Sequence, residues 1–155
     1  MIMLKRTIEE AIGKYLKSQE TKTLFVWGPR RSGKTTLINK LAQKLGVRKY
    51  NFDLLSDREK FAPTRDTLER IVKENKVILI DEVQNYPEAT VILKLLYDEF
   101  KVKVIATGSS ELRQKSSKEF DTMAGRFNEI YCLPLSIAEI MDNKKPKASE
   151  KEEFK

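Results

Sequence analysis

The sequence predicts an α/β fold in which helices cover both faces of a parallel β-sheet, and three observations support this. Five strand-like segments alternate with helical segments along the 155-residue chain, as expected for parallel strands joined by helices. Residues 77–80 are four successive branched apolar residues, which is typical of a strand buried on both faces. A β-prone apolar run at 23–27 leads directly into a glycine-rich loop and a helix.

In the first half of the chain the apolar pattern changes between a helical and a strand period. Segment 4–16 has apolar residues at a 3.6-residue spacing, which indicates an amphipathic helix, and Gly46 stands where a helix C-cap belongs. Residues 56–59 resemble a capping box. The predicted elements are, in order, a helix over 4–16, a polar connector over 17–22, a strand over 23–27, a helix over 36–45, a strand over 47–54 and a helix that opens at Pro63 and Thr64.

The second half of the chain continues the alternation. Segment 111–124 is polar and weakly periodic, so we expect a surface helix there. The predicted elements are, in order, a strand over 77–80, a helix that begins at 86–88, a strand over 101–106, the surface helix over 111–124, a strand over 128–133 and a short helix over 137–141. We therefore expect one domain over residues 1–141 and a charged, flexible tail over 142–155.

Composition limits the class of protein. The longest apolar runs are far too short to span a bilayer, and the N-terminus lacks the layout of a signal peptide. A single cysteine cannot form an internal disulfide, so we expect a reducing compartment, the cytoplasm, and no membrane partner. The absence of histidine excludes His-dependent catalytic triads and His-ligated zinc. A net charge of +7 would attract nucleic acid or another polyanion, although the basic residues are scattered rather than massed.

The glycine-rich loop between the first strand and its helix has the pattern G-x-x-x-x-G-K-[ST] of a phosphate-binding P-loop. Its glycines allow the backbone N–H groups to approach a polyphosphate, and the following helix N-terminus favours an anion. Lys34 can reach the β- and γ-phosphates of ATP, and the Thr35 hydroxyl can bind Mg²⁺. The predicted nucleotide-binding residues of this loop are Gly28, Pro29, Arg30, Arg31, Ser32, Gly33, Lys34, Thr35 and Thr36.

Two carboxylates, Asp81 and Glu82, follow the buried strand at 77–80 in a Walker B pattern. Ligand chemistry is typical of the carboxyl ends of strands in such sheets. We expect Asp81 to hold Mg²⁺, directly or through water, and Glu82 to orient the water that attacks the γ-phosphate. The alternative, two solvated acids at a strand end, is weaker because a P-loop lies upstream.

Small hydroxyl residues end the strand at 101–106. Thr107 and Ser109 could contact the γ-phosphate or position the attacking water. They could equally belong to a helix N-cap, a position that Ser and Thr favour. The two interpretations are compatible, and the sequence does not choose between them.

The segments GPRRSGKTT, VILIDEVQ, ATGSS, AGRF and LPLSIAEI together resemble the prokaryotic AAA-type P-loop ATPases, in the division with an additional strand and a catalytic glutamate. The resemblance covers residues 4–141. It implies a five-stranded parallel sheet of order 5-1-4-3-2 in a three-layer P-loop NTPase fold, ATP and Mg²⁺ as cofactors, and hydrolysis of ATP. Members usually continue into a further C-terminal domain, so we expect either a fragment or a minimal version with weak turnover.

The resemblance also implies a role for Arg126, in the AGRF segment, as a sensor or arginine finger. Such an arginine would stabilise the transition state in its own subunit or, in a homo-oligomer, in trans. The alternative is a surface arginine paired with an acid. The roles of Arg30 and Arg31 also have two interpretations, since these residues can contact phosphate or face a partner.

Three functions are compatible with these motifs. The first is Mg²⁺-dependent ATP hydrolysis, with Lys34, Glu82 and Arg126 in catalytic roles. The alternative is a nucleotide-gated switch that binds DNA or a protein and scarcely turns over, which the basic charge favours. A small-molecule kinase ranks third, because the acidic pair after the apolar strand is better suited to activating water.

Overall fold

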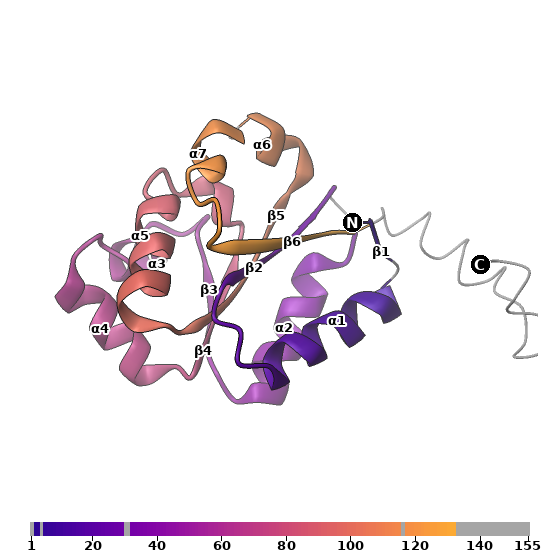
Figure 1. Cartoon of the computed structure of the whole chain (residues 1–155), viewed down its shortest axis with the longest axis horizontal. Helices are drawn as coiled ribbons and strands as arrows, with labels where there is room; N and C mark the ends of the chain where they lie inside the picture. Colours follow the sequence, from indigo (N-terminus) through magenta and orange to yellow (C-terminus); the bar gives the residue numbers. More distant parts are fainter. Residues whose placement is uncertain (1, 4, 30–31, 116, 133–155) are drawn as a thin grey trace, which may run out of the picture.

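A parallel β-sheet lies at the centre of the molecule (Figure 1). The computed structural model describes residues 2–3, 5–29, 32–115 and 117–132. The strands, in chain order, are β1 (Ile2–Met3), β2 (Thr23–Gly28), β3 (Lys49–Asn51), β4 (Val77–Asp81), β5 (Lys103–Ser109) and β6 (Phe127–Cys132). The helices are α1 (Lys5–Lys17), α2 (Lys34–Leu45), α3 (Leu55–Lys60), α4 (Arg65–Glu74), α5 (Ala89–Leu95), α6 (Ser110–Lys115) and α7 (Ser117–Asp121), with a 3₁₀ turn at Val83–Asn85 and a π-helical turn at Leu96–Phe100.

The strand order is β1-β6-β2-β5-β4-β3, and every pair is parallel. The five predicted strands therefore have the predicted order 5-1-4-3-2, with β5 between the strands that carry the P-loop and Asp81. The additional strand β1 pairs with β6 at the edge of the sheet, with Ile2 opposite Tyr131. A two-residue strand is too short to show an alternating pattern, so the sequence did not predict it.

Helices form a layer on each face of the sheet, α1 and α2 on one and α3, α4 and α5 on the other (Figure 1). The central strand β2 shows how the core is divided. Leu24 and Val26 belong to the apolar cluster of the α1–α2 face, and Phe25 and Trp27 belong to the cluster of the opposite face. Side chains alternate along a strand, so one fully buried strand supplies both cores.

The helix α1 is fastened to the amino end of β5 by Tyr15. Its hydroxyl donates a hydrogen bond to the Lys22 carbonyl at 2.6 Å and accepts one from the Val104 N–H at 3.2 Å. The Lys103 ammonium donates to the Tyr15 carbonyl at 2.8 Å and also bonds to the Glu20 carbonyl. Burial raises the pKa of the Tyr15 phenol well above its usual value, so the hydroxyl remains protonated.

The segment predicted as one surface helix over 111–124 contains two short helices, α6 and α7, and part of it is buried. Phe120 and Met123 are 3% and 0% exposed. The Phe120 ring packs edge-on against Phe25 and Trp27, at centroid distances of 5.4 and 5.2 Å. The prediction was wrong because two apolar residues in a polar stretch give no clear helical period, although together they cover the end of one core.

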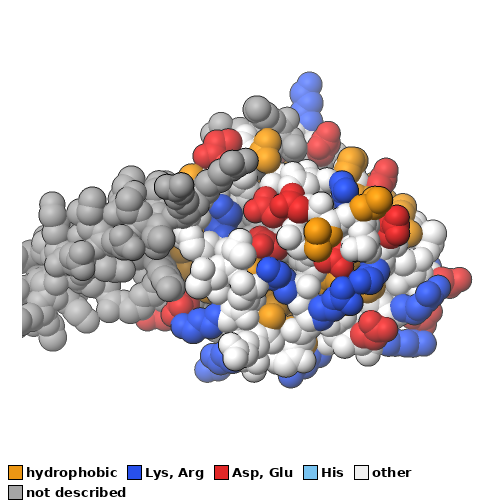
Figure 2. Space-filling view, turned by 180° about the vertical axis from the view of Figure 1, so that it is seen from behind, with side chains coloured by type: hydrophobic (Ala, Val, Ile, Leu, Met, Phe, Trp, Pro, Cys, Tyr) orange, Lys and Arg blue, Asp and Glu red, His pale blue; other side chains and the backbone are white. Residues whose placement is uncertain are grey.

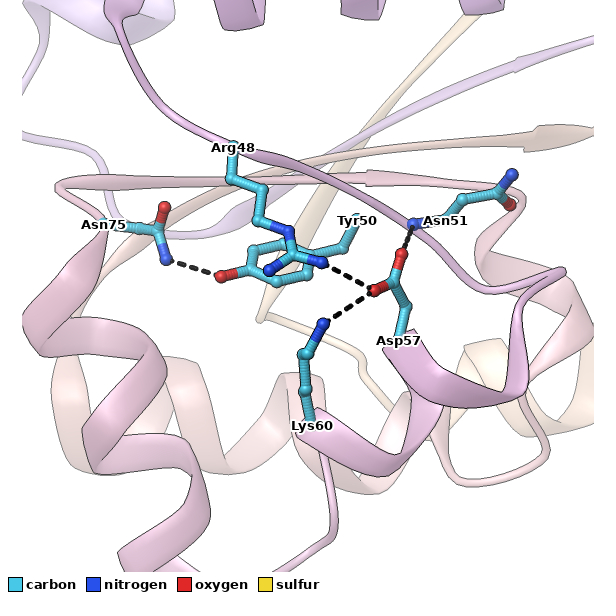
Figure 3. Close-up of polar contacts among 6 residues, drawn as sticks. All are labelled: Arg48, Tyr50, Asn51, Asp57, Lys60 and Asn75. Atoms are coloured by element: carbon cyan, nitrogen blue, oxygen red, sulfur yellow. Dashed lines mark hydrogen bonds and ion pairs between the residues drawn. The ribbon is translucent and has the colours of Figure 1, made fainter.

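The predicted capping box at 56–59 was also wrong. The helix α3 begins at Leu55, after a residue that makes no side-chain cap, so Ser56 lies inside the helix. Asp57 instead turns into the protein and accepts a hydrogen bond from the Asn51 N–H at 2.9 Å. It also pairs with Arg48 at 3.2 Å and Lys60 at 3.4 Å (Figure 3). This buried carboxylate joins α3 to the carboxyl end of β3.

Other predicted boundaries differ in smaller ways. The strand predicted over 47–54 is shorter in the structure and is limited to β3. The helix predicted to open at Pro63 and Thr64 is α4, and Thr64 caps it by accepting a hydrogen bond from the Thr67 N–H. The predicted helix over 137–141, the domain boundary at 141 and the tail over 142–155 lie outside the described residues.

The surface carries charges of both signs. On the face shown in Figure 2, basic and acidic side chains are interspersed. Every helix in the described part of the chain is too short or too polar to cross a lipid bilayer.

Candidate nucleotide site

The carboxyl ends of the parallel strands meet at one edge of the sheet, and a cleft opens there. β2 ends in Gly28, β4 in Asp81 and β5 in Ser109. The cleft has a volume of about 1010 Å³, which is ample for a nucleotide. Its lining residues are Pro29, Ser32, Gly33, Lys34, Thr35, Thr36, Asp53, Glu82, Gln84, Asn85, Ser109, Glu111 and Leu112.

The glycines of the loop have distinct physical roles. At Gly28 an added Cβ would lie 2.7 Å from the Ser32 hydroxyl and 2.9 Å from the Cys132 Cβ, so the tight approach of the loop to β6 requires glycine. Gly33 has a φ of 84°, in the left-handed region, and an added Cβ there would meet no atom within 4 Å. Its constraint is therefore conformational, and it allows the loop to turn into α2.

Lys34 lies against the loop from which it comes. Its ammonium donates hydrogen bonds to the carbonyls of Gly28 at 2.5 Å and Pro29 at 2.8 Å, and the residue is 7% exposed. Burial lowers the pKa of the Lys34 ammonium, and the nearby Glu82 carboxylate acts in the opposite direction. The loop thus holds a buried ammonium at the base of the cleft.

Asp81 is the centre of the polar contacts at the end of β4, and it is 2% exposed. Its carboxylate accepts hydrogen bonds from the hydroxyls of Thr35 at 3.1 Å and Thr107 at 2.5 Å. The Lys49 ammonium lies 3.9 Å away. Asp81 therefore joins the first turn of α2 to the strands on both sides of β4.

Glu82 has a left-handed backbone, with φ 56° and ψ 46°. This conformation is strained in a residue other than glycine and costs about 1 kcal/mol or more. A hydrogen bond from the Glu82 N–H to the Asp81 carboxylate, at 3.1 Å, helps to hold it. The Glu82 carboxylate accepts a second hydrogen bond from the Gln84 amide at 2.8 Å. The strained turn directs the half-buried Glu82 side chain to the wall of the cleft.

A family model described as "AAA domain" matches residues 20–141, which include the loop, the acidic pair and β5. The chain belongs to the AAA domain family. Among curated proteins, this AAA domain is 26% identical over 127 residues to the uncharacterized protein MJ1637 of Methanocaldococcus jannaschii. The match covers 72% of this chain and 26% of the relative, so the chain spans about a quarter of that protein's length.

Among solved structures, the AAA domain resembles a chain from a structure titled "Structural Basis for DNA Unwinding at Forked dsDNA by two coordinating Pif1 helicases". The TM-score is 0.48 and the identity 14%, over 83% of this chain and 44% of that chain. The family match and the strand order identify a nucleotide-binding ATPase domain with a P-loop NTPase fold.

The structure of the AAA domain brings most of the predicted site residues to this one edge. Those that line the cleft are Pro29, Ser32, Gly33, Lys34, Thr35, Thr36, Glu82 and Ser109. Asp81 and Thr107 lie directly behind this lining and are buried, and Gly28 supports the loop. Arg30 and Arg31 lie outside the described residues.

Arg126 is the exception, because it lies at the amino ends of the strands, whereas the cleft lies at their carboxyl ends. Its carbonyl accepts a hydrogen bond from the N–H of Thr23, the first residue of β2, whereas the P-loop follows the last residue of that strand. The six residues of β2 separate these two ends by about 17 Å. The guanidinium makes a two-pronged contact with Asp98, at 3.1 and 3.2 Å. Arg126 is thus a surface arginine paired with an acid, and it is too distant to contact its own subunit's nucleotide.

Several residues that line the cleft of the AAA domain were not predicted from the sequence, namely Asp53, Gln84, Asn85, Glu111 and Leu112. Asp53 follows the carboxyl end of β3, and its carboxylate bonds to the Asn85 amide. The rule that parallel strands end at one edge could have identified Asp53. The contacts of Gln84 depend on a different strand and carry no local sequence signal.

The donor set fits a nucleoside triphosphate with Mg²⁺. Lys34 and the loop amides suit phosphate, and the adjacent oxygens of Thr35 and Asp81 are the hard ligands that Mg²⁺ prefers. The glycine at 28 leaves no side chain that would fill the loop. Within the part of the chain that the structure describes, no cluster of three or more His, Cys, Asp or Glu residues suggests a different metal site.

Proposed function

We propose that this AAA domain binds ATP with Mg²⁺ and hydrolyses it to ADP and phosphate, as an ATPase of the division with a catalytic glutamate. The observation that carries the proposal is the hydrogen bond between Thr35 and Asp81, with Glu82 on the wall of the same cleft. One cation could contact both oxygens while the neighbouring carboxylate faces the attacking water. The membership in the AAA domain family supports the same reaction class.

Each residue has a role that follows from its chemistry. The loop amides and the Lys34 ammonium bind the phosphates, and Thr35 and Asp81 hold Mg²⁺, which neutralises charge on the phosphates when bound. The Glu82 carboxylate accepts a hydrogen bond from a water and orients its oxygen toward the γ-phosphorus. The bond from that oxygen to phosphorus forms as the bond to the bridging oxygen breaks, ADP leaves with the bridging oxygen, and the proton of the water passes to the Glu82 carboxylate and from there to the released phosphate. Ser109 lines the cleft and would position the γ-phosphate or the water, whereas the buried Thr107 would act through Asp81, to which it bonds.

The test of hydrolysis is Glu82→Gln, which keeps the size of the side chain and removes its charge. We expect ATP binding by calorimetry to be retained and steady-state phosphate release to fall about 100-fold or more. Exposed Glu59 on α3 offers a matched control, Glu59→Gln, which should leave both quantities unchanged. Unchanged phosphate release in Glu82→Gln would disprove the proposed role.

The test of binding is Lys34→Ala. Because the ammonium would lose its contacts to phosphate, we expect a large loss of affinity for ATP in the presence of Mg²⁺. Exposed Lys40, on the same helix, supplies the control variant Lys40→Ala. Intact ATP binding by Lys34→Ala in calorimetry would contradict the assignment of the whole loop.

A nucleotide-gated switch that binds DNA or a protein is the second candidate, and the net charge of +7 favours it. The mixed charges on the face in Figure 2 offer no continuous basic surface there. A DNA-binding role predicts an affinity that falls steeply as salt is raised. Electrophoretic mobility shifts at low salt, with and without ATP, test this role, and no shift at low salt would remove it.

We also propose further domains in the longer relatives and a conditional role for oligomerisation. The curated relative is about four times as long as the matched region, so we propose that such proteins carry a further domain, which the resemblance to AAA-type ATPases places on the C-terminal side. We further propose that, if Arg126 has a catalytic role, it acts in trans in a homo-oligomer, because its own cleft is at the opposite ends of the strands.

A further inference from the structure

The Gln84 side chain spans two strands at the edge of the cleft. Its amide nitrogen donates a hydrogen bond to the Glu82 carboxylate at 2.8 Å, and its amide oxygen accepts one from the Ser109 N–H at 3.3 Å. The first contact needs a donor and the second an acceptor, so only one orientation of the amide satisfies both. One side chain therefore connects the end of β4 to the end of β5.

The space for this amide depends on Gly108. An added Cβ at position 108 would lie 2.4 Å from the Gln84 amide oxygen and 2.5 Å from the Trp27 ring. Such distances are far below van der Waals contact, and the strand backbone is buried on both sides. The amide is thus seated against the backbone of β5, although Gln84 itself is only half-buried and lines the cleft.

The connection continues beyond β5. The Ser109 hydroxyl donates a hydrogen bond to the Glu111 carboxylate at 2.5 Å, and Glu111, in the first turn of α6, also lines the cleft. Glu82 is thereby linked to α6 through Gln84 and Ser109. The acceptor contact of Gln84 thus lies at Ser109, the residue that directly precedes α6.

We propose that Gln84 is a positioning residue that holds the Glu82 carboxylate beside the end of β5. This inference rests on the proposed hydrolysis of ATP. Gln84 acts through Glu82, which has a strained backbone and needs support from a neighbour to keep one orientation. The proposed phosphate contacts come from the loop and Lys34 rather than from Gln84, so we expect Gln84 variants to affect turnover more than nucleotide binding.

The test compares steady-state kinetics of the wild type with Gln84→Met and Gln84→Glu. Methionine keeps the length but removes both hydrogen bonds, and glutamate keeps the length but replaces the donor with a second negative charge. We expect kcat for phosphate release to fall about 10-fold or more in both, while KM and the affinity for ADP change less than about 2-fold. Exposed Gln43 on α2 supplies the control Gln43→Met, which should match the wild type.

A double-mutant cycle distinguishes positioning from a merely structural effect. If Gln84 acts through Glu82, adding Gln84→Met to Glu82→Gln should not slow the residual single-turnover rate further. Multiplicative effects, or an unchanged kcat in both Gln84 variants, would overturn the inference. Phosphate release that survives Glu82→Gln alone would overturn the proposed function as well, whereas release lost in Glu82→Gln but unaffected in Gln84→Met overturns only the role of Gln84.

Discussion

Thr35 donates a hydrogen bond to Asp81 across 3.1 Å, although 46 positions separate the two residues in the chain. The contact brings the first turn of the helix after the P-loop to the end of β4. Since Thr107 from β5 bonds to the same carboxylate, three elements meet at one buried acid. The oxygens proposed to hold Mg²⁺ are therefore already adjacent, and binding the cation requires little rearrangement.

The first prediction concerns this acid. Asp81→Asn removes the charge that attracts the cation but keeps a group able to bond with the two hydroxyls. We expect the gain in ATP affinity that Mg²⁺ gives the wild type to be lost, as measured by calorimetry with Mg²⁺ and with EDTA. The variant Asp66→Asn, at an exposed position of α4, is the control. An unchanged Mg²⁺ effect in Asp81→Asn would show that the cation is held elsewhere.

The second prediction concerns Arg126 and its partner Asp98. Because their ion pair is exposed and distant from the cleft, Arg126→Ala should change the melting temperature only slightly. At low protein concentration it should leave phosphate release unchanged. Asp98→Ala should behave in the same way. A loss of turnover in Arg126→Ala alone, appearing only at concentrations where subunits associate in sedimentation experiments, would instead favour the role in trans.

The third prediction concerns the buried carboxylate of Asp57 (Figure 3). Asp57→Ala removes the acceptor for the Asn51 N–H and leaves Arg48 and Lys60 without their shared partner. Both cations are largely solvated, so we expect the free energy of unfolding to fall by about 1–3 kcal/mol rather than more. Urea denaturation measures this, and Asp57→Asn should lose less because its amide oxygen can still accept the hydrogen bond. Equal losses in the two variants would contradict the importance of that bond.

The fourth prediction is a pH dependence that arises from Cys132. Burial raises the pKa of this thiol to about 11, from about 9 in the unfolded chain. Between pH 9 and 11 the unfolded chain loses the proton that the native protein keeps, so the free energy of unfolding falls as the pH rises. The two-unit difference amounts to about 2–3 kcal/mol at most.

Comparison with Cys132→Ala isolates this contribution, because the other groups that titrate in this range are common to both proteins. Urea denaturation from pH 8 to 11 should show a steeper loss of stability in the wild type than in the variant. Parallel curves would mean that the thiol is not protected from ionisation in the native state.

Local patterns in the sequence predicted the strands and the position of the loop, whereas the order of the sheet was predicted from the resemblance to AAA-type ATPases. A loop that wraps phosphate needs glycine at fixed positions, and a strand buried on both faces needs successive apolar residues, as at 77–80. Parallel strands then place Thr35 and Asp81 at one edge without any further information.

Other features depend on residues that are distant in the chain and leave no such pattern. The role inferred for Gln84 depends on the missing side chain at Gly108, and the placement of Arg126 depends on an acid in the π-helical turn. Phe120 is buried only because Phe25 and Trp27 present a face for it to cover. In each case the partner cannot be chosen before the fold is known.

The anchoring of Tyr15 has a consequence for the opposite end of β5. The Tyr15 hydroxyl bonds to Val104 and the Lys103 ammonium bonds back to the helix, so a displacement of the strand along its axis would break contacts to α1. At the other end Ser109 is paired with Gly28 of β2, so a movement of Ser109 would also move the strand that leads into the P-loop.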